Sequence, residues 1–133
     1  MPAINFIFDE LKADKVVVEE FLPGVEASYI VAAKGLKAVP MASSHDYKRL
    51  LDNQQGPNTG GMGSVSPTFN LTEEQERWVH ANVIEPTLGE LAKRGISYTG
   101  FLYAGLMISP SGKISVLEFN ARMGDPELSL IHI

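Results

Sequence analysis

The sequence predicts an α+β fold with a largely antiparallel sheet and one long helix that is kinked into a pair. Strand-like segments form two groups, one before residue 43 and one after residue 98, and the only long helical pattern lies between them. Strands and helices therefore do not alternate, as they would in a parallel doubly wound sheet. The last two strand-like segments, 99–109 and 112–120, flank the short turn PSG, which favours a hairpin.

Three strands are predicted near the N-terminus. VVVEEFL (16–22) is rich in β-branched and aromatic residues and stops at a Pro-Gly turn. ASYIVAAKG (27–35) is predicted to form an antiparallel hairpin with it. KAVPMA (37–42) is a third strand, which Pro40 confines to a sheet edge or a bulge.

Residues 43–67 are polar and rich in Gly, Asn, Ser and Pro, which predicts a long loop with one turn of helix at most, from Asp46 to Leu51. Within it, GPNTGGMG (56–63) has neither the Gly-Lys-Ser/Thr of a P-loop nor GxGxxG spacing. Its backbone N–H groups could still face an anion, or its glycines could let a ligand approach closely. A flexible surface linker is the alternative interpretation.

The helix is predicted to begin at Thr72, whose TEEQ sequence is a capping-box start, and to continue to Gly95. Pro86 lies inside it and predicts a kink or break near Ile84, hence two helical pieces. Trp78 is expected to contribute to the core of the protein.

The last strand carries the most suggestive polar pattern. Alternation divides it between two faces, with Val116, Glu118 and Asn120 on one and a buried pair, Leu117 and Phe119, on the other. Two oxygen-bearing side chains about 7 Å apart along a strand can reach one hard cation such as Mg²⁺. An exposed polar strand face is the alternative.

The segment ARMGDPE (121–127) adds charged groups immediately beyond this strand, namely Arg122, Asp125 and Glu127. An arginine there suits a two-pronged grip on a phosphate or carboxylate. The end of the last strand is therefore predicted to be a functional site.

Composition excludes several classes of function. The chain has 133 residues, 44% of them hydrophobic, a net charge of −5 and no cysteine. No extended basic surface for nucleic acid is expected, and neither disulfides nor thiolate zinc sites can form. No apolar run approaches the roughly 20 residues that span a bilayer, and no export signal is visible, so a cytoplasmic protein without a membrane partner is expected.

Five blocks in order resemble the glycinamide ribonucleotide synthetase family of purine biosynthesis across residues 16–127: VVVEEFLPGVEAS, PMASSHDYKRLLD, GPNTGGMGSVSP, YTGFLYAGLMI and VLEFNARMGDPE. The resemblance implies the later portion of an ATP-grasp domain. It also implies a reaction in which ATP activates glycine as glycyl phosphate, which 5-phosphoribosylamine then captures on the path to IMP, with release of ADP and phosphate.

The resemblance further implies roles for individual residues. Adenine would be contacted by Glu19, Glu20, Phe21 and Leu22, and the ribose hydroxyls by Glu26. Mg²⁺ or Mn²⁺ would be held by Glu118 and Asn120, and Arg122 would stabilise charge on the transferring phosphoryl group. Glycine and phosphoribosylamine would face Asp46, Lys48, Pro57, Asn58, Thr59, Gly60, Gly61 and Asp125.

The chain also departs from the family pattern. YAGLMI lacks the acid that many ATP-grasp enzymes use as a further metal ligand, so a second metal site is not expected. Residues 1–15 match poorly, and LSLIHI (128–133) reads like a translated sequencing adapter, so it is expected to be a non-native tail.

The lid and flanking domains of the family have no counterpart in the sequence, so the remainder of a ligase chain is the expected partner. Little activity is expected from these residues alone. The alternatives are another ATP-grasp carboxylate–amine ligase, a nucleotide-binding module without catalysis, and a purely structural α+β domain.

Overall fold

The computed structural model describes residues 2–129, so most of the expected non-native tail, 130–133, lies outside the described residues. The strands are β1 (Val25–Lys34), β2 (Lys37–Pro40), β3 (His45–Leu51), β4 (Gln55–Val65), β5 (Thr99–Ile108) and β6 (Ile114–Asn120). The helices are α1 (Pro2–Asn5), α2 (Glu73–Val79), α3 (Glu85–Lys93) and α4 (Asp125–Ser129), with π-helical turns at Phe6–Glu10 and His80–Ile84 and a 3-10 turn at Asp52–Gln54.

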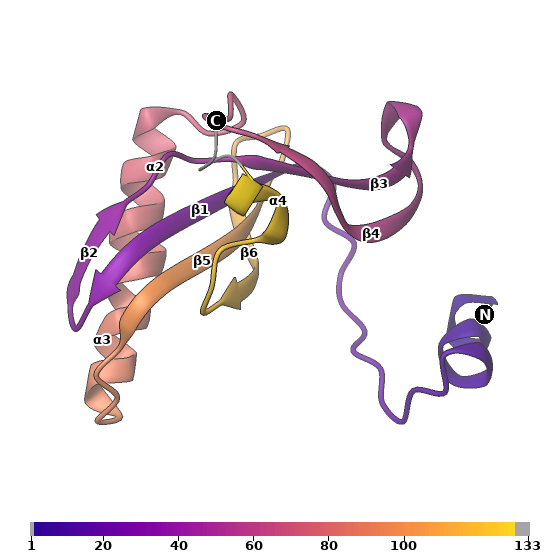
Figure 1. Ribbon diagram of the computed structural model, residues 1–133, viewed down its shortest axis with the longest axis horizontal. Helices are drawn as coiled ribbons and strands as arrows, with labels where there is room; N and C mark the ends of the chain where they lie inside the picture. Colours follow the sequence, from indigo (N-terminus) through magenta and orange to yellow (C-terminus); the bar gives the residue numbers. More distant parts are fainter. Residues whose placement is uncertain (1, 130–133) are drawn as a thin grey trace.

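The main sheet has the strand order β2-β1-β5-β6, and every neighbouring pair is antiparallel. Strands β3 and β4 form a separate hairpin that projects from the sheet (Figure 1). The prediction of a largely antiparallel α+β fold is confirmed. The β5–β6 hairpin also forms as predicted, and β2, which contains Pro40, lies at a sheet edge.

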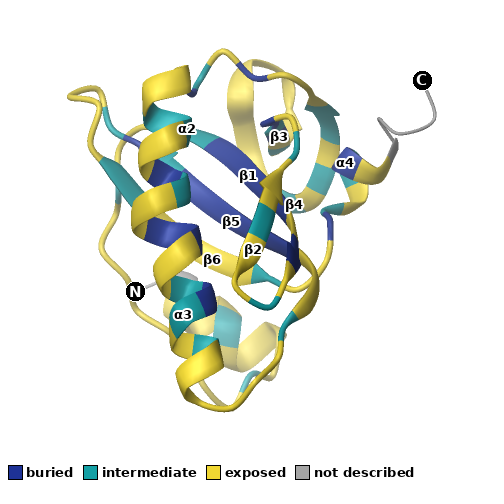
Figure 2. Ribbon diagram, turned by 90° about the vertical axis from the view of Figure 1, so that its left-hand side faces the viewer, coloured by how far each residue is buried: buried dark blue, intermediate teal, exposed yellow. Residues whose placement is uncertain are grey.

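The helices α2 and α3 cover one face of the main sheet (Figure 2). The core between them is built from alternate residues of β1 and β5 and from one apolar stripe of the helices: Ala27, Tyr29, Val31, Ala33, Leu102, Ala104, Leu106, Ile108, Val79, Val83, Ile84 and Leu88. Because this face is filled by the helices, polar residues that alternate with the core residues point to the opposite face.

The helix begins with the predicted capping box. Thr72 Oγ1 accepts a hydrogen bond from the Gln75 N–H at 3.2 Å, and Gln75 Oε1 accepts one from the Thr72 N–H at 3.0 Å. A π-helical turn, His80–Ile84, separates α2 from α3 immediately before Pro86, which lacks an N–H donor. The backbone stays helical through this turn, so the helix is not broken; the two predicted pieces are α2 and α3, joined into one continuous helix (Figure 1). Trp78 was wrongly assigned to the core, since it is 47% exposed.

Residues 16–22 form no strand, which corrects the first predicted element and its hairpin with 27–35. Val17 and Val18 are 81% and 84% exposed, and within residues 2–129 the segment pairs with no strand. β-Propensity describes how well side chains fit a sheet, but a strand also needs a neighbour for its backbone groups. The strand β1 begins only at Val25, and it pairs with β2 and β5.

The predicted loop 43–67 is also wrong, because most of it is the β3–β4 hairpin. Asp46 to Leu51 are extended, not helical, and GPNTGGMG lies within β4. Positive φ angles at Asn53 (56°) and Gln54 (59°) turn the chain between the strands, and Gly56 (80°) follows at the start of β4. The glycine-rich strand is extended because β3 supplies its backbone partners, with two register shifts along the pair.

The predicted division of β6 between two faces is partly wrong, because the strand contains a bulge. The register shifts between Glu118 and Val116, which leaves Leu117 as an extra residue. Val116 consequently lies opposite the buried Leu106, on the helix side of the sheet, and not beside Glu118. Leu117 and Phe119 are 37% and 46% exposed, so neither is buried as expected, because β6 is an edge strand.

Candidate functional site

The β3–β4 hairpin is attached to the main sheet through its first residues. The backbones of Ser28 and Ser44 exchange two hydrogen bonds, of 2.7 and 3.0 Å. Next along the chain, His45 Nδ1 donates to the backbone oxygen of Glu26 at 2.7 Å. These contacts bring the following residue, Asp46, to the face of the sheet that the helices leave uncovered.

A cavity of about 90 Å³ lies between this hairpin, the end of β6 and α4. We call it the β6 cavity. Seven residues predicted for the site line it: Asp46, Lys48, Gly60, Glu118, Asn120, Arg122 and Asp125. Tyr103 and Glu127, for which the sequence predicts no individual role, line it as well. The fold thus gathers charged groups from segments far apart in the sequence.

A second cavity, of about 310 Å³, lies at the start of β1, and we call it the β1 cavity. Four predicted residues line only this cavity: Phe21, Leu22, Glu26 and Asn58. Asp46 and Lys48 line both cavities. Phe21, Leu22 and Glu26, three of the five residues expected to contact the nucleoside, therefore line a cavity that adjoins the one lined by the expected metal ligands.

An ion pair stands between the two cavities, with Lys48 Nζ 3.1 Å from Glu26 Oε2. Burial alone would lower the pKa of Lys48, but the hydrogen bond and charge of Glu26 outweigh it, so this pKa lies above its usual value. Lys48 is consequently a fixed positive charge at the junction.

Asp46 and Glu127 are the most buried acids of the β6 cavity, at 8% and 4% exposure. Burial, reinforced by the negative charge of Glu127, raises the pKa of Asp46, although Lys48 opposes the shift. Asp46 Oδ1 and Glu127 Oε2 are buried and accept no hydrogen bond from the described residues. Glu127 Oε1 accepts only a long bond, 3.4 Å, from Ser44. This acidic pair lacks the donors that buried carboxylates normally have.

Tyr103 lines the same cavity as these acids. Its hydroxyl lies 2.7 Å from Ser28 Oγ, and burial raises its pKa above the usual value. The sheet register places Gly105 beside Glu118, and a Cβ on Gly105 would lie 3.1 Å from Glu118 Cγ. The residue of β5 next to Glu118 is therefore a glycine, in agreement with the absence of an acid in YAGLMI.

Two neighbouring glycines of β4, Gly60 and Gly61, differ in the space around them. Gly61 has φ of +128°, and a Cβ there would collide with Pro126 and lie 3.0 Å from Asp46 Oδ1. Gly60 has no positive φ, and a Cβ on it would meet nothing within 4 Å, although Gly60 lines the β6 cavity. Gly61 is thus required for packing, whereas Gly60 leaves space open.

Five predicted site residues line neither cavity, and one of them is Gly61, described above. Glu19, Glu20 and Pro57 are exposed. Thr59 instead holds the hairpin, since its hydroxyl donates to the Lys48 backbone oxygen at 2.8 Å and accepts from the Gly61 N–H at 3.1 Å.

Two other observations limit the site. Within the described residues, no three His, Asp or Glu side chains are grouped so that they could hold a metal ion. Across residues 2–129, no helix has the length and apolar character needed to cross a membrane.

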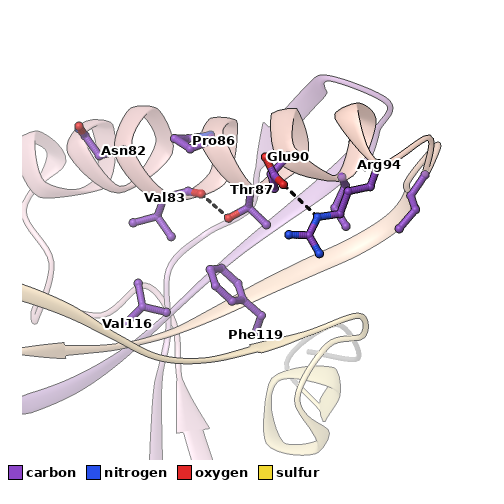
Figure 3. Close-up of a pocket in the computed structure, with 10 residues that line it drawn as sticks. Asn82, Val83, Pro86, Thr87, Glu90, Arg94, Val116 and Phe119 are labelled. Carbon is purple, nitrogen blue, oxygen red and sulfur yellow. Dashed lines mark hydrogen bonds and ion pairs between the residues drawn. The ribbon is translucent and has the colours of Figure 1, made fainter.

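A wide apolar groove of about 500 Å³ lies on the other side of the sheet, between α3 and β6 (Figure 3). We call it the α3 groove. Phe119 and Val116 face the helix there, and Glu90 pairs with Arg94 at its rim at 2.9 Å. It shares no lining residue with the β6 cavity, so it is separate from the gathered charges.

The sequence contained only weak signals for Tyr103 and Glu127. Alternation along β5 places Tyr103 on the face opposite Leu102 and Ala104, but a tyrosine there is as easily a core residue. Glu127 was noted beyond β6 without a role, because its burial depends on α4 folding back over β4. A Cβ on Gly124 would collide with the Glu127 carboxylate, so this glycine permits that arrangement.

Comparison with protein families gives one match over nearly the whole chain. The family described as "Phosphoribosylglycinamide synthetase, ATP-grasp (A) domain" matches residues 4–128. A phosphoribosylamine–glycine ligase from Ralstonia nicotianae is 56% identical over 113 residues, which is 85% of this chain and 27% of the relative. The chain thus spans about 27% of the length of this curated relative.

Solved structures give the same result. The crystal structure of a phosphoribosylamine–glycine ligase from Thermotoga maritima is 41% identical with a TM-score of 0.74, covering 82% of this chain and 27% of that chain. The biotin carboxylase domain of a 2-oxoglutarate carboxylase from Hydrogenobacter thermophilus has a TM-score of 0.62 at 15% identity, covering 96% of this chain and 26% of that chain, which shows a shared fold alone. The predicted ATP-grasp fold is confirmed.

Proposed function

Because the chain belongs to the phosphoribosylglycinamide synthetase family, by its ATP-grasp (A) domain, we propose that it is part of a phosphoribosylamine–glycine ligase. Such a ligase joins glycine to 5-phosphoribosylamine and converts ATP to ADP and phosphate through glycyl phosphate. The observation that carries the proposal is the β6 cavity, which gathers seven of the residues assigned to substrates, metal and catalysis.

Glu118 and Asn120 are the proposed ligands of Mg²⁺, or of Mn²⁺ in its place. Both side chains lie on the uncovered face of β6 and line the same cavity. Their oxygens suit a hard cation, and Mg²⁺ is commonly held by one or two protein ligands with substrate phosphates completing its shell. The absence of a three-acid group among residues 2–129 fits this sparse protein coordination.

The β1 cavity is the proposed nucleoside site. Phe21 and Leu22 offer apolar contact to adenine, and Glu26 offers a carboxylate to the ribose hydroxyls. Lys48 occupies one oxygen of Glu26, but an ionised carboxylate accepts about four hydrogen bonds in total. Glu19 and Glu20, which are exposed, are proposed to contact adenine as well, from the segment that leads to Phe21.

Phosphoryl transfer needs little covalent chemistry from the protein, so positioning and charge are the main contributions. Magnesium supplies charge neutralisation on the phosphates when it is bound. Arg122 is the proposed catalytic residue, because it lines the β6 cavity and its guanidinium, which carries five N–H donors, donates one hydrogen bond within the described residues, to the Met123 backbone oxygen at 3.0 Å.

The acceptor side of the site is proposed to comprise the β3–β4 hairpin and the start of α4. Asp46, Lys48 and Asp125 would contact glycine and 5-phosphoribosylamine. Gly60 would leave them room, while Asn58 would reach from the β1 cavity. Gly61, Thr59 and Pro57 would act by holding the strand in place.

The remainder of the ligase chain is the proposed partner, because the relatives are several times longer than these residues. On this proposal the enzyme works in the cytoplasm on glycine, 5-phosphoribosylamine and ATP, and this chain alone has little or no ligase activity. Phosphate release from the purified chain that depended on both glycine and 5-phosphoribosylamine would contradict the last point.

The test of the proposed function is Mg²⁺-dependent binding of ATP or ADP, measured by isothermal titration calorimetry. Glu118→Gln and Asn120→Ala are expected to remove the Mg²⁺ dependence, because each removes one proposed ligand. Glu85→Gln, an exposed acid on α3, is the matched control and should bind as the unaltered chain does. Binding that kept its Mg²⁺ dependence in both site variants would refute the metal assignment.

A further inference from the structure

Glu26, the proposed ribose ligand, is the second residue of β1, and within residues 2–129 its only partner in the sheet is Met107 of β5. On the other edge of β1, the bridge between Ser28 and Ser44 is isolated, and β2 pairs with β1 only from Val31 onward. The Glu26 backbone oxygen therefore needs a donor other than a neighbouring strand.

Two side chains supply donors to this oxygen. Asn70 Nδ2 donates to it at 2.9 Å, and His45 Nδ1 donates to it at 2.7 Å. The two donor nitrogens lie 3.0 Å apart. A backbone carbonyl has two lone pairs, so it can accept both hydrogen bonds. The Glu26 backbone is thus held from two segments, the start of β3 and the loop before α2.

Asn70 is itself held in place by its neighbours. Its backbone N–H donates to Thr68 Oγ1 at 3.1 Å, and the Thr68 N–H donates to the Ser43 backbone oxygen at 3.1 Å. The next residue, Leu71, is 7% exposed and belongs to the core. Because these contacts fix the backbone of Asn70, its amide reaches Glu26 from a defined position, as a supporting group for a binding site should.

Strand β3 also holds the other end of Glu26. Lys48 of this strand lies 3.1 Å from Glu26 Oε2, while His45 holds the backbone oxygen. The hairpin therefore fixes the backbone and the carboxylate of Glu26 together, and Asn70 adds a contact from a different segment. Loss of the Asn70 donor should let the Glu26 backbone move, weaken the ion pair and release the side chain into several rotamers.

We propose that Asn70 and His45 are positioning residues, which hold Glu26 so that its carboxylate meets the ribose hydroxyls of the nucleotide. This inference rests on the proposed function and deepens it. It assigns the preference for a nucleotide with ribose hydroxyls to an asparagine outside the β1 cavity as well as to a histidine that lines it. If the two hydrogen bonds only stabilised the fold, their loss would weaken the binding of every nucleotide equally.

The test compares ADP with 2′,3′-dideoxy-ADP, which lacks both ribose hydroxyls, by isothermal titration calorimetry of the whole chain with Mg²⁺. Asn70→Leu removes the amide donor at a similar side-chain size. It should weaken ADP binding by about tenfold, the usual strength of a hydrogen bond to a charged group, and change dideoxy-ADP binding by less than about twofold. His45→Leu should show the same pattern, and Asn70→Gln, which keeps a donor, should recover part of the ADP affinity.

Asn82→Leu is the matched control, because Asn82 also donates to a backbone oxygen, that of Trp78 at 2.9 Å, but lines neither cavity. It should leave both affinities unchanged. Asn70→Leu should have no further effect once Glu26→Ala has removed the carboxylate. Equal weakening of both nucleotides by Asn70→Leu, or unchanged ADP binding, would overturn the proposal. If Asn70→Leu fails to fold, Asn70→Gln and His45→Leu decide the comparison.

Three-bond NMR couplings about χ1 of Glu26, measured without nucleotide, separate this inference from the proposed function. The unaltered chain and Asn82→Leu should show one staggered rotamer, and Asn70→Leu should show an average over several. This result without Mg²⁺-dependent ADP binding would refute the nucleotide role and keep the positioning of Glu26. Mg²⁺-dependent ADP binding by a chain in which Glu26 already samples several rotamers would do the opposite.

Discussion

Lys48 Nζ lies 3.1 Å from Glu26 Oε2, and this ion pair separates the cavity at the start of β1 from the cavity at the end of β6. Lys48 lines both cavities, so its charge acts on the proposed nucleoside site and on the buried acids together. The pair therefore links the position of the β3–β4 hairpin to the charge balance of the whole site.

Lys48→Met should raise the pKa of Asp46 further, because Lys48 is one of the groups that hold this pKa down. Nucleotide affinity should fall at the same time, since a cation beside the phosphates is lost. Carboxyl ¹³C NMR of Asp46 and calorimetry with ADP measure the two effects. Lys93→Met, an exposed lysine of α3, serves as control. An unchanged Asp46 titration would show that Lys48 does not act on the acids.

The stability of the chain should decrease with pH because of Asp46. Its pKa in the folded state lies above the ordinary value of 3.8, mainly through burial. The folded state therefore holds more protons than the unfolded state between 3.8 and the raised pKa, and stability is lost as pH rises through this interval.

Asp46→Asn removes this penalty and should raise the free energy of unfolding at pH 7, while the gain should vanish well below the ordinary carboxyl pKa. Urea unfolding at both pH values measures the difference. The exposed Asp52→Asn should change little. Equal stabilisation by Asp46→Asn at every pH would contradict the explanation by ionisation.

Two neighbouring glycines should respond differently to the same substitution. Gly61→Ala should destabilise the chain by about 1–3 kcal/mol, because the positive φ and the contact with Pro126 leave no room for a methyl group. Gly60→Ala should leave stability nearly unchanged and reduce glycine binding, since its methyl group would enter an open part of the β6 cavity. Thermal unfolding and NMR titration distinguish the two effects. Similar destabilisation by both would show that Gly60 is needed for folding.

Elements with complete local signals were predicted correctly from the sequence. The helix start follows from the Thr72 capping box, and the β5–β6 hairpin follows from its turn. GPNTGGMG was missed as a strand because its extended conformation depends on pairing with β3, which its own composition does not reveal. The segment 16–22 was wrongly predicted as a strand. Its residues favour a strand, but among the described residues no other strand pairs with it.

The candidate site was predictable in parts. Glu118 and Asn120 follow from alternation, which holds on that side of the β6 bulge and fails for Val116. That Asp46 is buried beside Glu127 depends on tertiary contacts between β3, β4 and α4, which no spacing rule encodes. The acidic pair could be recognised only after the fold brought the two residues into one cavity.

The apolar stripe of the helices should supply much of the stability of the sheet. Leu88 is 1% exposed, and Leu88→Ala should lower the free energy of unfolding by about 2–5 kcal/mol through lost contacts and a residual cavity. Trp78→Ala should cost far less, because that side chain is 47% exposed. Urea denaturation compares the two variants. If Trp78→Ala lowered the free energy of unfolding more than Leu88→Ala does, Trp78 would be a core residue, contrary to its exposed position in the structure.

The α3 groove should make the isolated chain associate with itself. Phe119 is 46% exposed on an edge strand and faces an apolar groove of about 500 Å³ (Figure 3), and exposed apolar patches of this kind usually bind other protein surfaces. Phe119→Lys should weaken association by about tenfold or more, because it places a charge in the groove. Leu36→Lys, an exposed leucine between β1 and β2, is the control. Sedimentation velocity over a range of concentrations measures the effect. A chain that stays monomeric throughout, or one in which Leu36→Lys weakens association as much as Phe119→Lys, would rule out the groove as the contact surface.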